Sequence, residues 1–138
     1  MYRIVLAFCF TAFTFVSCSS ETVSTIVAPS VETISADGLK QLVDSGEKFV
    51  FVDVREPSEI QRDGTLNNYT NIPIGQLEKR ISEIPHGNKI VVACEWGARA
   101  GRGAALLKKH GYKDVLSAGM NEYRQKGFPL IHPNLSGQ

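Results

Sequence analysis

Two continuous apolar runs stand out along the chain, at residues 49–54 and 89–94. Both are rich in valine, isoleucine and phenylalanine, and such runs are typical of strands that are buried on both faces of a parallel sheet. A shorter run at 114–116 predicts a third strand. The segment Ile72–Ile74 predicts a short edge strand, because a proline is tolerated at the edge of a sheet.

Between these runs the apolar residues recur at helical spacing. Leu39, Leu42 and Val43 follow Ser35, whose hydroxyl can cap a helix, and Gly46 is a suitable stop. Further helices are expected from Pro57, through Leu77, Arg80 and Ile81, from Ala98 to His110, and from Asn121 to Lys126.

Alternating strands and helices predict an α/β fold. We expect three layers, α/β/α, with a central parallel sheet covered on both faces and joined by right-handed crossovers. The chain has 138 residues, which suits a single domain. The boundaries that we expect for this domain are residues 32–130, followed by a C-terminal tail at 131–138.

The first residues have the layout of an export signal. Arg3 precedes an apolar run, Ile4 to Val16, without any charged residue. A helix of this length reaches only ~20 Å, short of the ~30 Å core of a bilayer. We therefore interpret residues 1–17 as a signal peptide rather than a membrane span or a buried core helix.

Cys18 follows the apolar run directly and resembles the lipidated cysteine of a bacterial lipobox, although Phe15 replaces the usual leucine. Lipidation would tether the protein to a membrane surface. Ordinary signal cleavage after Ser19 is the alternative. Both interpretations predict an exported protein, periplasmic or in the cell envelope, in which residues 18–31 form a lipid-anchored or flexible spacer.

Composition excludes several other classes of protein. Fifteen Lys and Arg against fourteen Asp and Glu give a formal charge of +1, so nothing favours nucleic acid as a partner. Three widely spaced cysteines are too few for a disulfide-rich scaffold. Since there is no Cys-x-x-Cys motif and none of the three histidines is clustered with a cysteine, a zinc finger is not expected, and we expect no metal site. We expect the protein to act as a monomer.

Cys94 is the candidate nucleophile, because it ends the second apolar run. Ligands of open α/β sheets bind at the carboxyl ends of the strands. A turn containing Gly97 then leads into a helix, whose N-terminal N–H groups and dipole favour the thiolate over the thiol. Arg99 can add a positive charge. The structural alternative is that Cys94 only fills the core as a small apolar residue.

The segment from Cys94 to Arg99 reads Cys-x-x-Gly-x-Arg, which resembles the active loop of the rhodanese family of sulfurtransferases. Further landmarks are similar to the family in order and spacing: Asp53-Val54-Arg55, Asn71-Ile72-Pro73, and the closing part from Gly111 to Tyr123. The resemblance covers residues 32–130 and implies the rhodanese-like fold.

The resemblance implies a thiosulfate sulfurtransferase without a cofactor. Cys94 would take sulfane sulfur from thiosulfate or a persulfide and pass it to cyanide or a thiol, so its partners are small sulfur-containing anions or thiols. A non-catalytic rhodanese-like module that binds a partner or senses sulfide is the alternative. Cysteine phosphatases, which have one more residue between cysteine and arginine, are a more distant alternative.

Several residues modify this expectation. Glu95 should place a negative charge beside the thiolate and weaken the binding of a dianion. Trp96 either shields the persulfide or packs on the loop. Ala98 and Ala100 complete the substrate-binding loop with Gly97, and Ala100 lacks the hydroxyl that is common in the family. Asp53 and Arg55 are interpreted as structural support for the loop rather than as catalytic groups.

Overall fold

The computed structural model describes residues 30–134. Within them, five parallel strands form one sheet in the order β1-β5-β4-β2-β3. The strands are β1 (Glu32–Thr33), β2 (Phe49–Asp53), β3 (Tyr69–Asn71), β4 (Lys89–Cys94) and β5 (Val115–Gly119). The central position of β4 confirms the prediction that the strand ending at Cys94 is internal.

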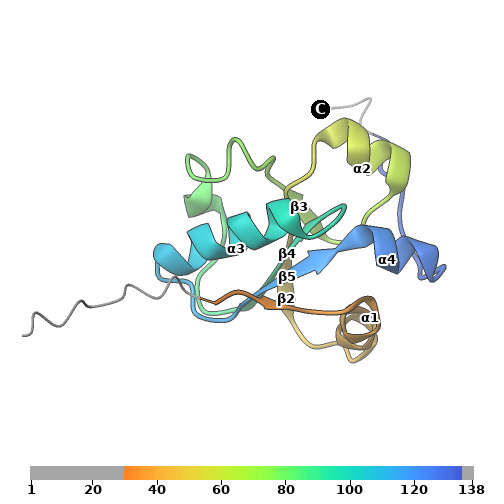
Figure 1. Ribbon diagram of the computed structural model, residues 1–138, viewed down its shortest axis with the longest axis horizontal. Coiled ribbons are helices and arrows are strands. Elements are labelled where there is room, and N and C mark those ends of the chain that lie inside the picture. Colours follow the sequence, from red (N-terminus) through yellow and green to blue (C-terminus); the bar gives the residue numbers. More distant parts are fainter. Residues whose placement is uncertain (1–29, 135–138) are drawn as a thin grey trace, which may run out of the picture.

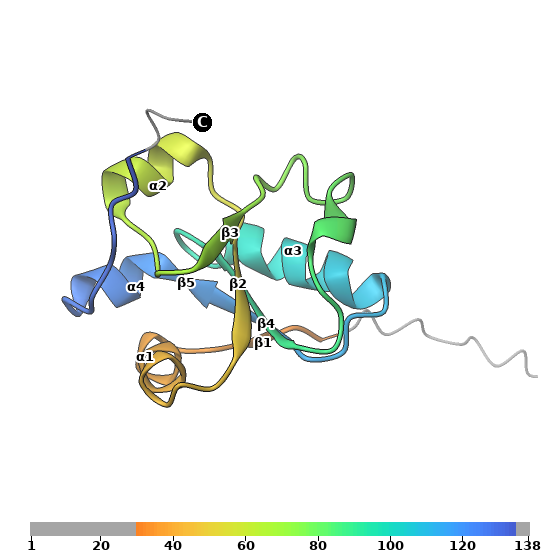
Figure 2. The same ribbon diagram turned by 180° about the vertical axis from the view of Figure 1, so that it is seen from behind.

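Helices cover both faces of this sheet, and the predicted α/β/α fold class is confirmed (Figure 1). The helices are α1 (Ala36–Asp44), α2 (Pro57–Asp63), α3 (Ala98–Lys109), α4 (Met120–Gln125) and the short 3₁₀ helix η1 (Ile81–Glu83). Seen from behind, α1 lies across the sheet from α3 (Figure 2). The core residues of α1 and α4 belong to one apolar cluster and those of α3 to the other.

Local signals explain where the first two helices begin. The hydroxyl of Ser35 accepts a hydrogen bond from the Gly38 N–H at 3.1 Å, which satisfies one free N–H of the first turn of α1. Pro57 occupies the first turn of α2, where its missing N–H costs nothing. Glu56 and Glu59 form a capping box around the same turn.

Strand β4 joins the two halves of the core. Its side chains alternate, as in any strand, so that Val92 and Cys94 face the cluster under α3 while Val91 and Ala93 face the cluster under α1 and α4. All four are at most 1% exposed. Burial on both faces is the physical reason why this segment reads as a continuous apolar run.

Two expected elements differ in the structure. The edge strand is Tyr69–Asn71 and not Ile72–Ile74, because its partner β2 ends at Asp53, opposite Asn71; Ile72 and Ile74 still donate to the Asp53 and Val54 carbonyls at 3.1 and 3.0 Å. The helix expected through Leu77 and Arg80 is a series of turns that ends in η1. Only isolated backbone hydrogen bonds of turns form in this segment, and the Leu77 side chain packs in the core at 0% exposure.

Some predictions concern the two ends of the chain, parts of which lie outside the described residues. The signal peptide at 1–17, Cys18 and most of the spacer at 18–31 lie outside the described residues. At the other end, Ile131 pairs with Thr65 through two backbone hydrogen bonds of 2.9 and 2.8 Å. Between residues 30 and 134, no helix has the length and apolar character needed to cross a membrane.

Candidate active site

The Cys94 sulfur lies at the carboxyl end of β4, inside a loop of backbone N–H groups. It accepts hydrogen bonds from the Gly97 N–H at 3.1 Å and from the Ala100 N–H at 3.3 Å. Cys94 is a free cysteine and is only 1% exposed. Two converging donors at the N-terminus of a helix stabilise negative charge on a sulfur atom. The expected cradle for a thiolate is therefore present.

Gly97 gives this loop its shape. Its φ of +89° lies in the left-handed region, and it is the residue immediately before α3. A residue with a Cβ adopts that conformation only at a cost, whereas glycine does so freely. Ala98 is the first residue of α3, and the fully buried Ala100 turns its N–H toward the sulfur. The position that lacks the family hydroxyl thus still supplies a backbone donor.

Arg99, which was expected to add a positive charge to the loop, is paired with a carboxylate of α2. Its two terminal nitrogens donate to the two carboxylate oxygens of Glu59 at 2.7 and 2.6 Å. The hydrogen bond to Glu59 raises the pKa of Arg99, and attraction to the Cys94 sulfur adds to this in smaller measure. The guanidinium therefore lies within electrostatic reach of Cys94 while its charge is shared with α2.

Glu95 also differs from the expectation. Its carboxylate accepts hydrogen bonds from Arg55 at 3.3 Å and from both terminal nitrogens of Arg124, one of them at 3.2 Å. The hydrogen bond to Glu95 raises the pKa of Arg124. Arg55 and Arg124 compensate this negative charge, so Glu95 is not an unpaired anion beside Cys94. The expectation rested on the position of Glu95 next to Cys94 in the sequence, which does not reveal that Arg55 and Arg124 lie beside its carboxylate in the fold.

Asp53 and Arg55 form the buried base of this network. Arg55 donates to both carboxylate oxygens of Asp53, the shortest contact being 2.7 Å, and both side chains are 0% exposed. Burial disfavours the charge of Arg55, but hydrogen bonding and attraction to Asp53, together with Glu95, outweigh it and raise the pKa. The Thr65 hydroxyl donates to Asp53 at 2.9 Å. The geometry agrees with the interpretation of structural support.

Trp96 projects from the loop. Its exposed fraction is 76%, so it does not pack extensively on the loop. A pocket of about 450 Å³ lies beside it, lined also by Gly97 and by Asn121 of α4. The Asn121 N–H donates to the Glu95 carbonyl at 2.9 Å and ties this side of the loop to α4.

Sequence reasoning did not identify Glu59, Arg124 or Thr65 as parts of the site. Glu59 lies 40 positions from Arg99, and its segment was expected only to begin a helix at Pro57. Arg124 carries no local signal. Within residues 30–134, no cluster of His, Cys, Asp and Glu side chains is arranged to hold a metal ion.

The fold and the loop together define a class: an α/β domain that presents a cysteine in a short N–H-lined loop between a central strand and a helix. The family model for the rhodanese-like domain matches residues 35–126. The chain therefore belongs to the rhodanese family.

Similar proteins carry names related to sulfur chemistry. "Putative sulfur carrier protein YrkF" of Bacillus subtilis is 35% identical over 101 residues, which cover 72% of this chain and 54% of that protein. This chain thus spans about half the length of YrkF. A protein named "Sulfurtransferase" from Allochromatium vinosum is 31% identical over 105 residues, 75% of this chain and 97% of that protein.

Solved structures agree on the fold. The crystal structure of a rhodanese-related protein from Thermoplasma volcanium has a TM-score of 0.67 and 25% sequence identity to this chain. The match covers 74% of this chain and 99% of the Thermoplasma protein, so the similarity extends over almost the whole of that protein.

Proposed function

We propose that this protein is a sulfurtransferase that carries sulfur as a persulfide on Cys94. The observation that carries the proposal is the pair of N–H groups, from Gly97 and Ala100, which converge on the Cys94 sulfur at 3.1 and 3.3 Å. Such donors stabilise a thiolate before the reaction and a persulfide anion after it. Membership of the rhodanese family and the names of two relatives support the same chemistry.

Thiosulfate is the donor that we propose for the first step. The Cys94 thiolate attacks the outer sulfur of thiosulfate, the S–S bond of the donor breaks, and sulfite leaves with the bonding electrons. Because Glu95 is compensated by Arg55 and Arg124, it does not repel this dianion as strongly as its sequence position suggests. Arg99, in the first turn of α3, adds a positive charge on the same helix that supplies the Ala100 N–H.

An acceptor completes the cycle. Cyanide or a thiolate attacks the outer sulfur of the persulfide, a new bond to sulfur forms, and the Cys94 thiolate is released. Neither step needs an external oxidant or reductant, nor a cofactor. We propose a protein or small-molecule thiol as the natural acceptor, on the strength of the sulfur-carrier name of YrkF.

Intact-mass spectrometry tests the proposal directly. Incubation with thiosulfate is expected to add one sulfur atom to the chain, and cyanide is expected to remove it as thiocyanate. Cys94→Ser abolishes the gain, whereas Cys18→Ser is the matched control and keeps it. If neither thiosulfate nor an organic persulfide loads the protein, the proposal fails and a non-catalytic binding or sensing module is the better description.

We further propose that the protein is exported and anchored through a lipid on Cys18. The charged start, the apolar run of residues 4–16 and the cysteine directly after it support this. Expression in a bacterial host with radiolabelled palmitate is expected to label the protein, and Cys18→Ser to prevent it. A cytoplasmic product that retains Met1 would contradict both export and anchoring.

A further inference from the structure

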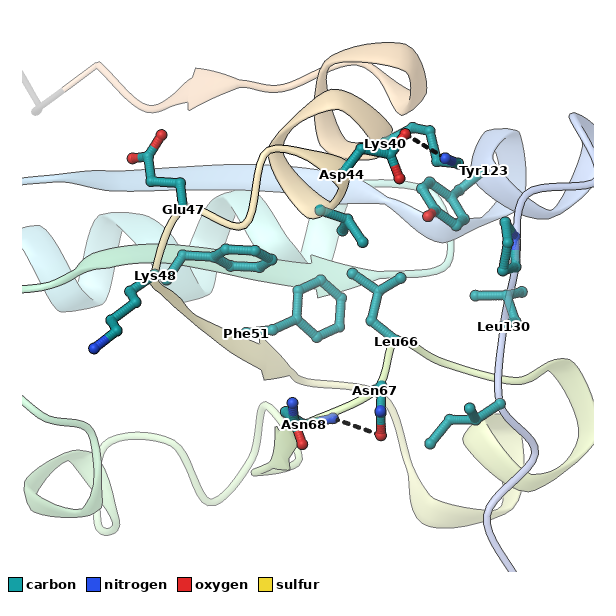
Figure 3. Close-up of a pocket in the computed structure, with 14 residues that line it drawn as sticks. Lys40, Asp44, Glu47, Lys48, Phe51, Leu66, Asn67, Asn68, Tyr123 and Leu130 are labelled. Carbon is teal, nitrogen blue, oxygen red and sulfur yellow. Dashed lines mark hydrogen bonds and ion pairs between the residues drawn. The ribbon is translucent and has the colours of Figure 1, made fainter.

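A second cavity lies apart from the Cys94 loop. It has a volume of about 610 Å³, opens to the surface and is lined by residues of α1, the start of β2, the segment 66–68, α4 and the segment 129–131 (Figure 3). None of the loop residues from Cys94 to Ala100 lines it. Cavities of 300–1,000 Å³ are the size in which proteins bind small molecules.

The walls of this cavity are mainly apolar. Phe51 and Leu66 are at most 4% exposed, and they line it together with Phe49, Val43 and Leu130. In Figure 3 the Phe51 ring and Leu66 lie next to each other among the lining side chains, and both belong to the same apolar cluster. A space of this kind favours a ligand with an aromatic or aliphatic body.

Tyr123 places a polar group in the cavity wall. The residue is only 1% exposed, and its ring packs edge-on against Phe128 at 5.0 Å. Its hydroxyl has no hydrogen-bond partner among residues 30–134, and Figure 3 shows the oxygen on the side of the ring that faces Phe51 and Leu66. Among the described residues no fully buried side-chain oxygen or nitrogen lacks a hydrogen-bond partner, so this unpartnered hydroxyl is open to the cavity and available to a ligand there.

The hydroxyl of Tyr123 is a donor at neutral pH. Burial and the negative charge of Asp44 both raise the pKa of Tyr123, which keeps the proton in place. The hydroxyl can therefore donate its proton to an acceptor atom of a ligand, such as a carbonyl oxygen.

Charges at the mouth of the cavity are largely compensated. Asp44 is paired with Lys40, and Glu47 with Lys89 at 2.6 Å. The Lys48 side chain extends away from the cavity in Figure 3. No strong field of one sign therefore selects a highly charged ligand, and the walls favour a neutral one.

We propose that this cavity binds a neutral, mainly apolar small molecule that carries a carbonyl-type oxygen, and that the Tyr123 hydroxyl donates a hydrogen bond to that oxygen. The proposal does not depend on sulfur transfer, because the cavity shares no residue with the Cys94 loop.

The test uses two probes of the same shape, acetophenone and α-methylstyrene, of which only acetophenone has an oxygen acceptor. Each is titrated into the ¹⁵N-labelled full chain and followed by NMR. Acetophenone is expected to shift the amides of residues that line the cavity and to bind more tightly than α-methylstyrene. Tyr123→Phe is expected to weaken acetophenone about fivefold, the size of one neutral hydrogen bond, and to leave α-methylstyrene unchanged.

Tyr69→Phe is the matched control, since it removes the same group from a tyrosine outside the cavity lining. Val43→Trp is expected to fill the cavity and abolish binding of both probes. The proposal is overturned if acetophenone leaves the cavity amides unmoved, or if Tyr123→Phe does not change its affinity. It is also overturned if those amides shift with protein concentration alone, because a second copy of the chain would then occupy the cavity.

Discussion

At the level of single residues, one backbone angle decides the geometry around the candidate nucleophile. The φ of +89° at Gly97 aims its N–H at the Cys94 sulfur, 3.1 Å away. Nothing lies within 4 Å of the position that a Cβ would take, so the obstacle to a side chain is the backbone conformation and not a clash.

Gly97→Ala is therefore expected to lower the free energy of unfolding by about 1–2 kcal/mol, the cost of a left-handed conformation for a residue with a Cβ. It should also slow the loading of Cys94 with sulfur, because relaxation of the strain moves the N–H. Gly101→Ala is the matched control in the same helix start, with open space and an ordinary φ. It is expected to stabilise the protein by about 0.5–1 kcal/mol and to load normally. Urea unfolding and intact mass measure the two effects, and normal loading of Gly97→Ala would contradict the role of this N–H.

A second prediction concerns Glu95, which joins two arginines. Glu95→Gln removes the charge that compensates Arg55, although Arg55 keeps Asp53. We expect a loss of about 2 kcal/mol in the free energy of unfolding, because a buried cation loses part of its compensation. Glu122→Gln, at an exposed pair with Lys126, should have no measurable effect. Equal urea midpoints for the two variants would show that Glu95 is not a structural anchor.

At the level of elements, the pair of Glu59 and Arg99 fastens α2 to the start of α3. Hydrogen bonding to Arg99 holds the pKa of Glu59 at about 2, below its usual 4.5. Since the folded-state pKa is lowered, the pair stabilises the protein fully above pH 4.5. This stabilisation is lost as the pH falls from there toward 2.

We expect the loss over this range to be about 1–2 kcal/mol, less than the full linkage value, because the two side chains are 22% and 27% exposed. Chemical unfolding between pH 6 and pH 2.5 measures it. In Glu59→Gln this part of the acid dependence should disappear while the rest remains. An unchanged pH profile in that variant would mean that the pair does not contribute to stability.

At the level of the whole molecule, β4 contributes side chains to both apolar clusters. Val91 and Val92 are both 0% exposed and face opposite sides of the sheet. The two halves of the core therefore share one strand and should unfold together.

Val91→Ala and Val92→Ala are each expected to cost about 2 kcal/mol through lost burial and an unfilled cavity. In both variants, circular dichroism in the far and near ultraviolet should report the same single transition. Two separate transitions in either variant would show that the faces of the sheet unfold independently. Fluorescence is a poor probe here, because the single Trp, Trp96, is 76% exposed in the folded state.

The elements that could be predicted from the sequence are those whose signal is local. Burial on both faces makes β2 and β4 continuous apolar runs, and the caps at Ser35 and Pro57 mark the starts of two helices. The two-residue strand β1 is not apparent in the same way, since it is short and exposed and exists only because β5 pairs with it. The same holds for the turns after Pro73, whose conformation depends on the burial of Leu77.

By itself, the sequence determined the α/β class, the candidate nucleophile Cys94 and the loop that ends at Arg99, because a strand end, a turn glycine and a helix start are adjacent in the chain. Only the tertiary structure decided how the charges around that loop are compensated. Glu59 and Arg124 lie 40 and 29 positions from the loop residues they bind. Coulombic and hydrogen-bond energies depend on distance in space, and folding alone brings these groups together. For the same reason, the cavity beside Tyr123 has no signature in the sequence.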